Sequence, residues 1–211
     1  CLAMKVVLKS TLKRGGLRVD EVDAFDFYSC FPAPIELALD ALQIDFRDPR
    51  PFSITGGLAY AGGPGNNYVM HSLATAVARL RHKPSERILV TGVGMANTKH
   101  AATLLAHAEN VPHSATGLTD YRIETADSAL VVDTKASGTC TVVTYTIEYN
   151  RDGDPINVIY ILDTRDSKRA IANVSDPAAA TSQILRFDPI GKTGELIWDE
   201  QQQRQFFNLQ S

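Results

Sequence analysis

The sequence predicts an α/β protein built from a layered α/β domain and a small β-rich domain that follows it. Helical and strand-like hydrophobic patterns alternate over the first half, whereas strand patterns joined by a hairpin signal dominate the second. The charge changes as well: residues 1–118 have 12 Lys and Arg against 10 Asp and Glu, and residues 119–211 have 9 against 14. We therefore predict domains at 1–105 and 119–211, joined by a linker at 106–118 that is rich in Asn, Pro, Ser and Gly.

Helices and strands alternate in the first domain. A helix begins near Leu2 and ends at Gly15-Gly16, since glycine readily adopts the conformation that ends helices. A strand over 24–31, a helix over 35–42 that begins near Pro34 and a short strand over 52–55 follow. A glycine-rich loop at 56–65 precedes a second long helix, and a strand at 87–91 leads into a glycine-containing segment. The long helix is expected to bury one stripe of apolar residues: Val69, Leu73, Val77 and Leu80.

The second domain is predicted from hairpins and one short helix. Residues 139–149 alternate as a strand, Asp152-Gly153 signals a tight turn, and 156–162 forms the return strand. Further strands are predicted at 169–174 and 196–198, and Asp176-Pro177 begins a short helix. Together these elements predict a small barrel resembling the oligonucleotide-binding fold in shape.

Composition excludes several classes of function. The net charge of −3 argues against a nucleic-acid role. Three sparse cysteines, Cys1, Cys30 and Cys140, form no disulfide framework, so we expect a reducing, cytoplasmic location. No apolar run is long enough for a membrane span, and no Cys/His cluster has metal-ligand spacing. Because the chain starts at Cys1 inside a helical pattern, we expect it to be a fragment of a longer protein.

Three ordered motifs resemble the C-terminal half of thiolases. Tyr28-Ser29-Cys30-Phe31 follows a helix and an acidic turn, where sterol-carrier-type thiolases have His-Asp-Cys-Phe. Gly62-Gly63-Pro64 resembles the Gly-His-Pro segment, with Gly63 in place of the histidine, and Thr91-Gly92-Val93-Gly94 lies where many thiolases have Cys-x-Gly. The additional C-terminal domain makes type 1 thiolase-like proteins the family that the chain resembles most closely.

The resemblance implies acyl transfer or Claisen-type chemistry on coenzyme A thioesters, as in acetyl-CoA acetyltransferases of lipid metabolism. Such chemistry needs a nucleophilic thiolate, an acid or base at the α-carbon, and donors for the thioester oxygen. The thiolase N-terminal half, which supplies the nucleophile, is expected as a missing partner, and the coenzyme A thioester is expected as a substrate rather than as a covalently bound cofactor. Gly63 removes one oxyanion donor, so this chain is not expected to be competent alone.

The resemblance places the expected catalytic groups at Cys30, as acid or base, and at Tyr28, in place of the family's histidine. Cys30 can equally be a small buried hydrophobe at a strand end, and Tyr28 a packed aromatic. The expected substrate-binding residues lie in the glycine-rich loop and beyond it: Tyr60, Gly62, Gly63, Asn66, Asn67, Gly92 and His100. Asn66 or Asn67 can instead cap the following helix.

Three functions remain open at this point. The first is a thiolase-class acyltransferase completed by the N-terminal half, with a possible homo-oligomeric assembly. The second is a CoA-thioester aldolase or lyase, in which Tyr28 or Tyr60 moves the proton. The third is a non-catalytic acyl-CoA-binding module, which the replacement of histidine by Gly63 favours.

Overall fold

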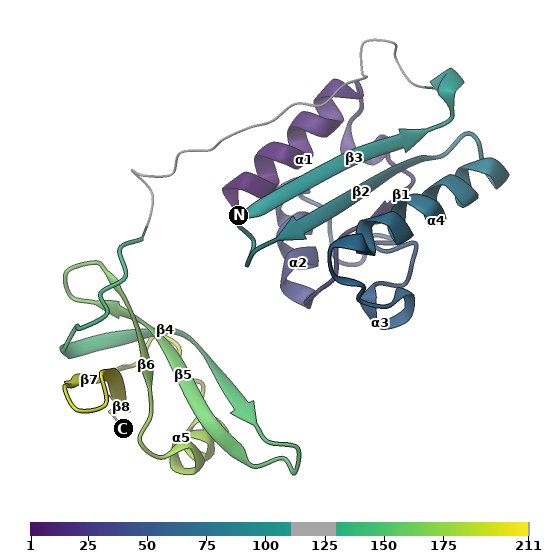
Figure 1. The fold of residues 1–211 in the computed structure, drawn as a ribbon. Helices are drawn as coiled ribbons and strands as arrows, with labels where there is room; N and C mark the ends of the chain where they lie inside the picture. Colours follow the sequence, from purple (N-terminus) through teal and green to yellow (C-terminus); the bar gives the residue numbers. More distant parts are fainter. Residues whose placement is uncertain (111–129, 211) are drawn as a thin grey trace. The chain divides into compact units, whose positions relative to one another are not determined.

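The computed structural model describes residues 1–110 and 130–210 of the chain (Figure 1). The chain forms two compact units, Cys1–Ile123 and Glu124–Ser211, and each is described by itself. Within the predicted linker, residue 106 ends a strand and Ala108–Asn110 form a 3-10 turn. The part of the linker from 111 to 118 lies outside the described residues, so its extent stays a prediction.

The first unit is a three-stranded sheet covered by helices on both faces. Strand β1 (Ala24–Asp26) pairs in parallel with β2 (Arg87–Gly94), and β3 (Lys99–Ala106) pairs antiparallel with the other edge of β2. Helix α1 (Leu2–Arg14) packs on β3 and on α2 (Pro32–Leu42), whereas α4 (Tyr68–His82) packs on β2. The shorter helical elements are α3 and three 3-10 turns: α3 (Leu58–Ala61), η1 (Val19–Glu21), η2 (Gly65–Asn67) and η3 (Ala108–Asn110).

The residues of β2 alternate between two apolar cores, as the period of a strand requires. Leu89 packs with residues of α1 and α2, whereas Ile88 and Val90 pack with Ala76 and Leu80 of α4. All three β2 residues are buried. The layered α/β architecture predicted for this half of the chain is therefore confirmed.

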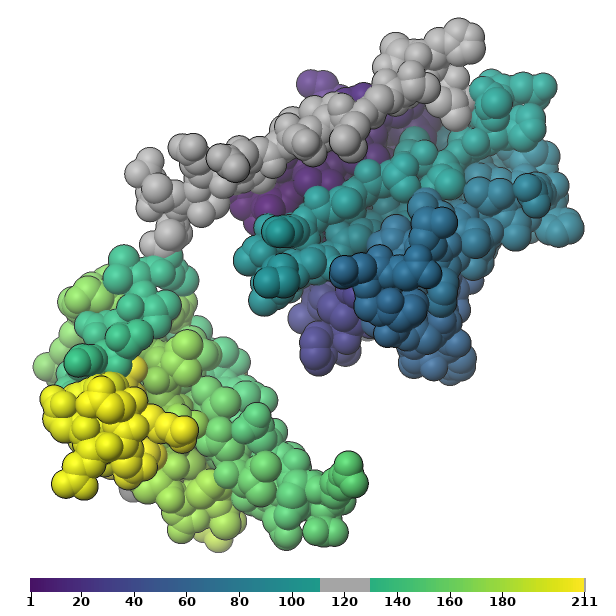
Figure 2. Space-filling model, viewed as in Figure 1, coloured from purple at the N-terminus to yellow at the C-terminus, as the bar shows by residue number. Residues whose placement is uncertain are grey.

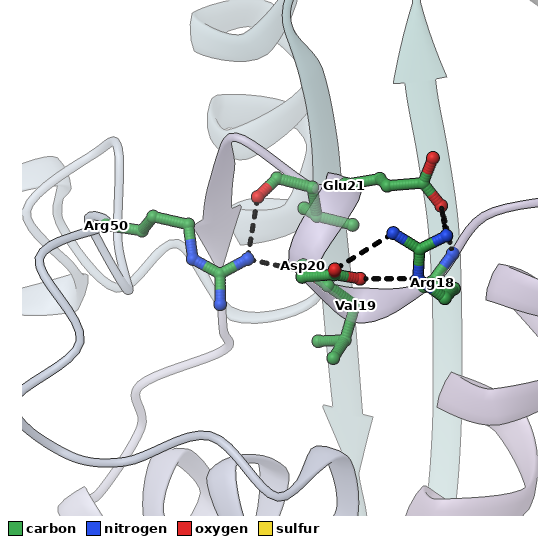
Figure 3. A network of polar contacts seen from close by, with 6 residues as sticks. Arg18, Val19, Asp20, Glu21 and Arg50 are labelled. Atoms are coloured by element: carbon green, nitrogen blue, oxygen red, sulfur yellow. Dashed lines mark hydrogen bonds and ion pairs between the residues drawn. The ribbon is translucent and has the colours of Figure 1, made fainter.

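Partly buried polar contacts hold the segment that leads into β1. Arg50 pairs with Asp48, with 2.7 Å between Nη2 and Oδ2. Its Nη1 also donates to the carbonyl oxygens of Val19 and Val22, and Figure 3 shows Arg50 beside the turn that contains Val19. The Arg50 guanidinium also lies 4.9 Å from the centre of the Phe25 ring. The paired guanidinium holds the pKa of the Asp48 carboxyl at about 2, below its usual value of 3.8. This cluster fixes the chain at the point where β1 begins.

Several predicted elements are corrected by the structure. The strand predicted over 24–31 stops at Asp26, and Pro32 begins α2 because a proline at the first helical position needs no N–H partner. The strand predicted over 52–55 is reduced to a single bridge between Asp26 and Ser53. The antiparallel strand β3, which forms one edge of the sheet, was not predicted.

The buried stripe of α4 is shifted by one position from most of the predicted one. The buried side chains are spaced four residues apart, and they are Tyr68, Ser72, Ala76 and Leu80. Of the predicted stripe, Leu80 is buried and Val77 remains 40% exposed, whereas Val69 and Leu73 are partly buried and pack against the same core. The buried face of α4 was misplaced because it contains the polar Ser72, and a hydrophobic pattern counts only apolar residues.

An open groove lies beside α4 on the first unit. It has a volume of about 730 Å³ and is lined by residues of α4, β3 and their flanking turns, including Val77, Leu80, Pro84, Leu105 and His107. Figure 2 shows α4 in blue and β3 in teal on the visible face of this unit. Here the sheet is covered less completely than on the face where α1 and α2 pack.

The second unit is a closed five-stranded barrel with the strand order β4-β5-β6-β8-β7. Its elements are β4 (Gly138–Tyr149), β5 (Pro155–Thr164), β6 (Arg169–Asn173), α5 (Pro177–Ile184), β7 (Thr193–Asp199) and β8 (Arg204–Leu209). Gly153 takes a positive φ of 89° in the predicted hairpin turn, and the Asp176 side chain caps α5 by accepting from the Ala179 N–H at 2.9 Å. A small barrel was predicted and is found, but its likeness to the oligonucleotide-binding fold is not confirmed.

A register shift divides β4 into two parts. Between Val142 and Thr144 one extra residue of β4 is accommodated opposite β5. Val142 is buried before the shift, and Tyr145 and Ile147 pack against the same core after it. The regular alternation predicted for residues 139–149 is therefore interrupted at the shift, because Cys140 and Val142 face the core before it and Tyr145 and Ile147 after it.

Candidate functional site

The three segments that carry the thiolase-like motifs meet at the carboxyl ends of β1 and β2. The Tyr28 N–H donates to Thr91 Oγ1 over 2.9 Å, which joins the turn after β1 to β2 just beyond the last pair of their parallel ladder. The Leu58 N–H donates to Ser29 Oγ over 3.2 Å, which joins the same turn to the glycine-rich loop. The Tyr28 ring also packs edge-on against Tyr68 of α4, with 5.2 Å between the ring centres. In open α/β sheets, this edge is where ligands commonly bind.

Two glycines are required by close contacts within this arrangement. Gly57 has φ of 81° and ψ of −177°, and a Cβ there would lie 2.5 Å from Ser29 Oγ. Only glycine readily adopts this backbone conformation. At Gly92, a Cβ would lie 3.2 Å from Val69 Cγ2, so glycine lets α4 approach β2 closely. The packing role of Gly92 is thus visible, whereas its predicted role in substrate binding stays a prediction.

The glycine-rich loop is organised by its own hydrogen bonds. The Gly62 N–H donates to the Leu58 carbonyl over 3.1 Å, and His71 Nδ1 donates to the Ala61 carbonyl over 2.8 Å. His71 therefore holds the end of α3 against α4. At Gly63 a Cβ would meet only Leu58 Cδ2, at 3.7 Å, so there is room for a side chain at the position where the family has histidine.

The other candidates around the loop are exposed to solvent. Cys30 is exposed in the turn just before α2, and Tyr60 is 86% exposed on α3. Asn66 and Asn67 are exposed too. Asn67 occupies the N-cap position of α4, as its alternative role predicted, but its side chain makes no capping hydrogen bond. Cys30 is not the small buried hydrophobe that a lone cysteine usually is.

The polar contacts of His100 are with Asn97 and Cys1 rather than with the other candidate residues. Its Nε2 lies 2.8 Å from the Asn97 carbonyl oxygen and 3.4 Å from Cys1 Sγ, at the start of α1. The imidazole shares only a small cavity of about 10 Å³ with Thr91 and Gly92, which has room for about one water molecule. Since Nε2–H must donate to the carbonyl, this nitrogen is not free to accept the Cys1 proton.

A buried carboxylate beneath the site escaped the sequence analysis. Asp26, the last residue of β1, is fully buried and accepts hydrogen bonds from side chains of Ser53, Thr55 and Ser72. An acidic residue inside the otherwise apolar run from Ala24 to Phe27 was the available signal, because a buried charge needs hydrogen-bonding partners.

Comparison with known proteins identifies the class to which this arrangement belongs. Residues 123–201 match the family model of the thiolase-like protein type 1 additional C-terminal domain. A solved structure, that of a monomeric SCP2-thiolase-like protein type 1 from Mycobacterium smegmatis, resembles the chain with a TM-score of 0.84 and 29% identity. The resemblance covers 100% of this chain and 46% of that one. No curated protein matches the chain.

These findings confirm the resemblance inferred from the motifs: the chain is similar to thiolase-like proteins. More particularly, residues 123–201 match the additional C-terminal domain of type 1 thiolase-like proteins. It spans less than half of the solved protein that it resembles. No helix among the described residues is both long and apolar enough to cross a membrane.

Proposed function

We propose that this chain forms the C-terminal part of a thiolase-like protein that acts on acyl-CoA thioesters. The nucleophilic cysteine would come from a thiolase N-terminal half outside this sequence. The observation that carries the proposal is the meeting of the Cys30 turn, the glycine-rich loop and the end of β2 at one edge of the sheet. A thioester bound at this edge would face the exposed thiol of Cys30.

Cys30 is the proposed acid or base at the substrate's α-carbon. Its exposed thiol follows Tyr28, whose ring is held by Tyr68, so the turn that carries the thiol has a fixed position. The exposed loop side chains of Asn66 and Asn67 would bind the thioester or its pantetheine arm. Tyr60, on the same loop, is exposed enough to contact the ligand.

A second function, binding of acyl-CoA without catalysis, is favoured by Gly63. The imidazole that holds the thioester oxygen in the family is replaced by hydrogen, and loss of one oxyanion donor typically costs about 100- to 1000-fold in rate. Binding needs no such donor, so the loop can retain a CoA thioester while catalysing its reaction slowly or not at all.

Protection of Cys30 from alkylation tests both functions. In the protein that contains both thiolase halves, saturating acetyl-CoA should slow alkylation of Cys30 by iodoacetamide, because the ligand covers the thiol. The Cys30→Ala variant is the control, because it lacks the thiol and so identifies the part of the alkylation that belongs to Cys30. Equal rates with and without acetyl-CoA would refute binding at this edge.

Release of CoA then separates the two functions. Acyl transfer predicts turnover of acetyl-CoA that falls sharply in Cys30→Ala, while calorimetry shows that the variant still binds the ligand. Ligand protection without any release of CoA in the unsubstituted protein would favour the binding module.

A further inference from the structure

We propose that the buried carboxylate of Asp26 is a positioning residue that sets the geometry of the candidate site. The inference about ligand binding rests on the proposed function, whereas the inference about geometry does not. Asp26 lies at the end of β1, directly beneath the loop and the turn that form the site. Its side chain is fully buried among groups from two other segments.

Four donor groups converge on the two oxygens of this carboxylate. Oδ2 accepts from Ser53 Oγ at 3.1 Å, and from both the N–H and the hydroxyl of Thr55 at 2.9 Å. Oδ1 accepts from Ser72 Oγ at 2.7 Å, and the Tyr68 hydroxyl oxygen lies 3.5 Å from it. Asp26 therefore joins β1 to the segment before the glycine-rich loop and to the first turns of α4.

The carboxylate also fixes the direction of the hydroxyl hydrogen bonds. Thr55 has one hydroxyl proton, and donating it to Asp26 leaves its oxygen as an acceptor. That oxygen lies 2.8 Å from Tyr68 Oη and 3.1 Å from the Gly57 nitrogen. Tyr68 O–H and Gly57 N–H therefore donate to Thr55, whose own proton points to Asp26. Such chains of hydrogen bonds polarise and strengthen one another inside a protein.

The two outer members of this hydrogen-bond network, Gly57 and Tyr68, both contact segments of the candidate site. Gly57 begins the loop segment that packs on Ser29 of the Cys30 turn. The Tyr68 ring supports the Tyr28 ring from the other side of the same turn. One buried charge thus determines where the loop and the turn lie relative to each other, without touching any ligand itself.

Hydrogen–deuterium exchange of the full chain with Asp26→Asn tests the geometric part. The amide group retains the size of the carboxyl but presents an N–H₂ group to donors, so at least one bond is lost. Exchange in peptides covering 27–31 and 53–62 should accelerate about 10- to 100-fold, the range expected when a buried hydrogen bond to a charged group is removed. Exchange in the β2 core, 87–91, should change far less.

The matched control is Glu86→Gln, which weakens the ion pair with Arg79 at the opposite end of α4. It should affect peptides of the first unit evenly. If exchange rates in Asp26→Asn change uniformly across the first unit, or do not change near the site, Asp26 merely contributes to stability and the proposal is overturned. If Asp26→Asn does not fold, Ser72→Ala removes a single donor from Oδ1 and should give the same local pattern at roughly tenfold.

Acetyl-CoA binding by the protein that contains both halves tests the remainder. The expected result is about tenfold weaker binding in Asp26→Asn and unchanged binding in Glu86→Gln. Unchanged binding in Asp26→Asn would overturn the role in ligand binding. If the unsubstituted protein binds no acetyl-CoA, the proposed function fails, while the exchange result still decides the geometric part.

Discussion

Replacing Gly57 by alanine tests whether close packing of the loop on Ser29 holds the candidate site together. Gly57 and Gly62 both occupy a backbone region that is almost restricted to glycine, with φ of 81° and 82°. Alanine in this region costs about 1–3 kcal/mol at either position. At Gly57 alone the added Cβ would lie 2.5 Å from Ser29 Oγ, whereas at Gly62 it meets nothing within 4 Å.

The difference between the two alanine variants therefore measures the contact with Ser29. Displacing Ser29 also breaks its hydrogen bond with the Leu58 N–H, worth about 0.5–1.5 kcal/mol. We expect Gly57→Ala to lower the free energy of unfolding of the first unit by roughly 2–4 kcal/mol, and Gly62→Ala by only the conformational part. The added substitution Ser29→Ala should relieve part of the loss in Gly57→Ala.

Urea unfolding followed by far-UV circular dichroism is the appropriate assay. The long helices α1, α2 and α4 lie in the first unit, so the dichroism reports mainly on that unit. Trp198, the single tryptophan, lies in β7, and its fluorescence reports separately on the barrel, which should not change. Equal destabilisation by Gly57→Ala and Gly62→Ala would refute the close contact with Ser29.

Two further predictions concern other positions in the first unit. Asp48 has a pKa lowered to about 2 by its hydrogen bonds with Arg50, so the pair should stabilise the fold fully above the unfolded pKa of 3.8. About 1–2 kcal/mol should be lost as the pH falls from about 5 to 2, and Asp48→Asn should lack this part of the acid profile in urea titrations. Gly63→His should change the free energy of unfolding, measured by urea titration, by no more than about 0.5 kcal/mol, because the loop has room for a side chain there. A loss above about 1 kcal/mol would contradict that interpretation.

Sequence patterns predicted the layered first unit because its buried strand and helix motifs are local. The run from Ile88 to Val90 is apolar on both faces, and this identified the central strand. Strand β3 was not predicted because its turn has no glycine: Met95, Ala96 and Asn97 all take positive φ, and of these residue types only Asn commonly does so. Its residues are also rich in alanine, which has little preference for strands.

Sequence motifs predicted which segments contribute to the candidate site, but not the contacts that join these segments. The motifs placed Cys30, the loop and Gly92 in one region, and the hydrogen bonds of Ser29 and Thr91 join the segments that contain them. No local pattern could connect Asp26 with Ser72, since 46 residues separate them and both are polar where the pattern expects apolar side chains. Long-range polar pairing of this kind becomes visible only once the chain is folded.

Closure of the barrel has a consequence for association between molecules. Closure leaves fewer free strand edges than an open sheet has, and such edges are the places where unrelated chains add as extra strands. The junction of β6 with β8 is nevertheless narrow, because its parallel pairing consists of Asn173 opposite Phe206. Opening there would expose two strand edges at once, so this junction is where the barrel would first become prone to aggregation.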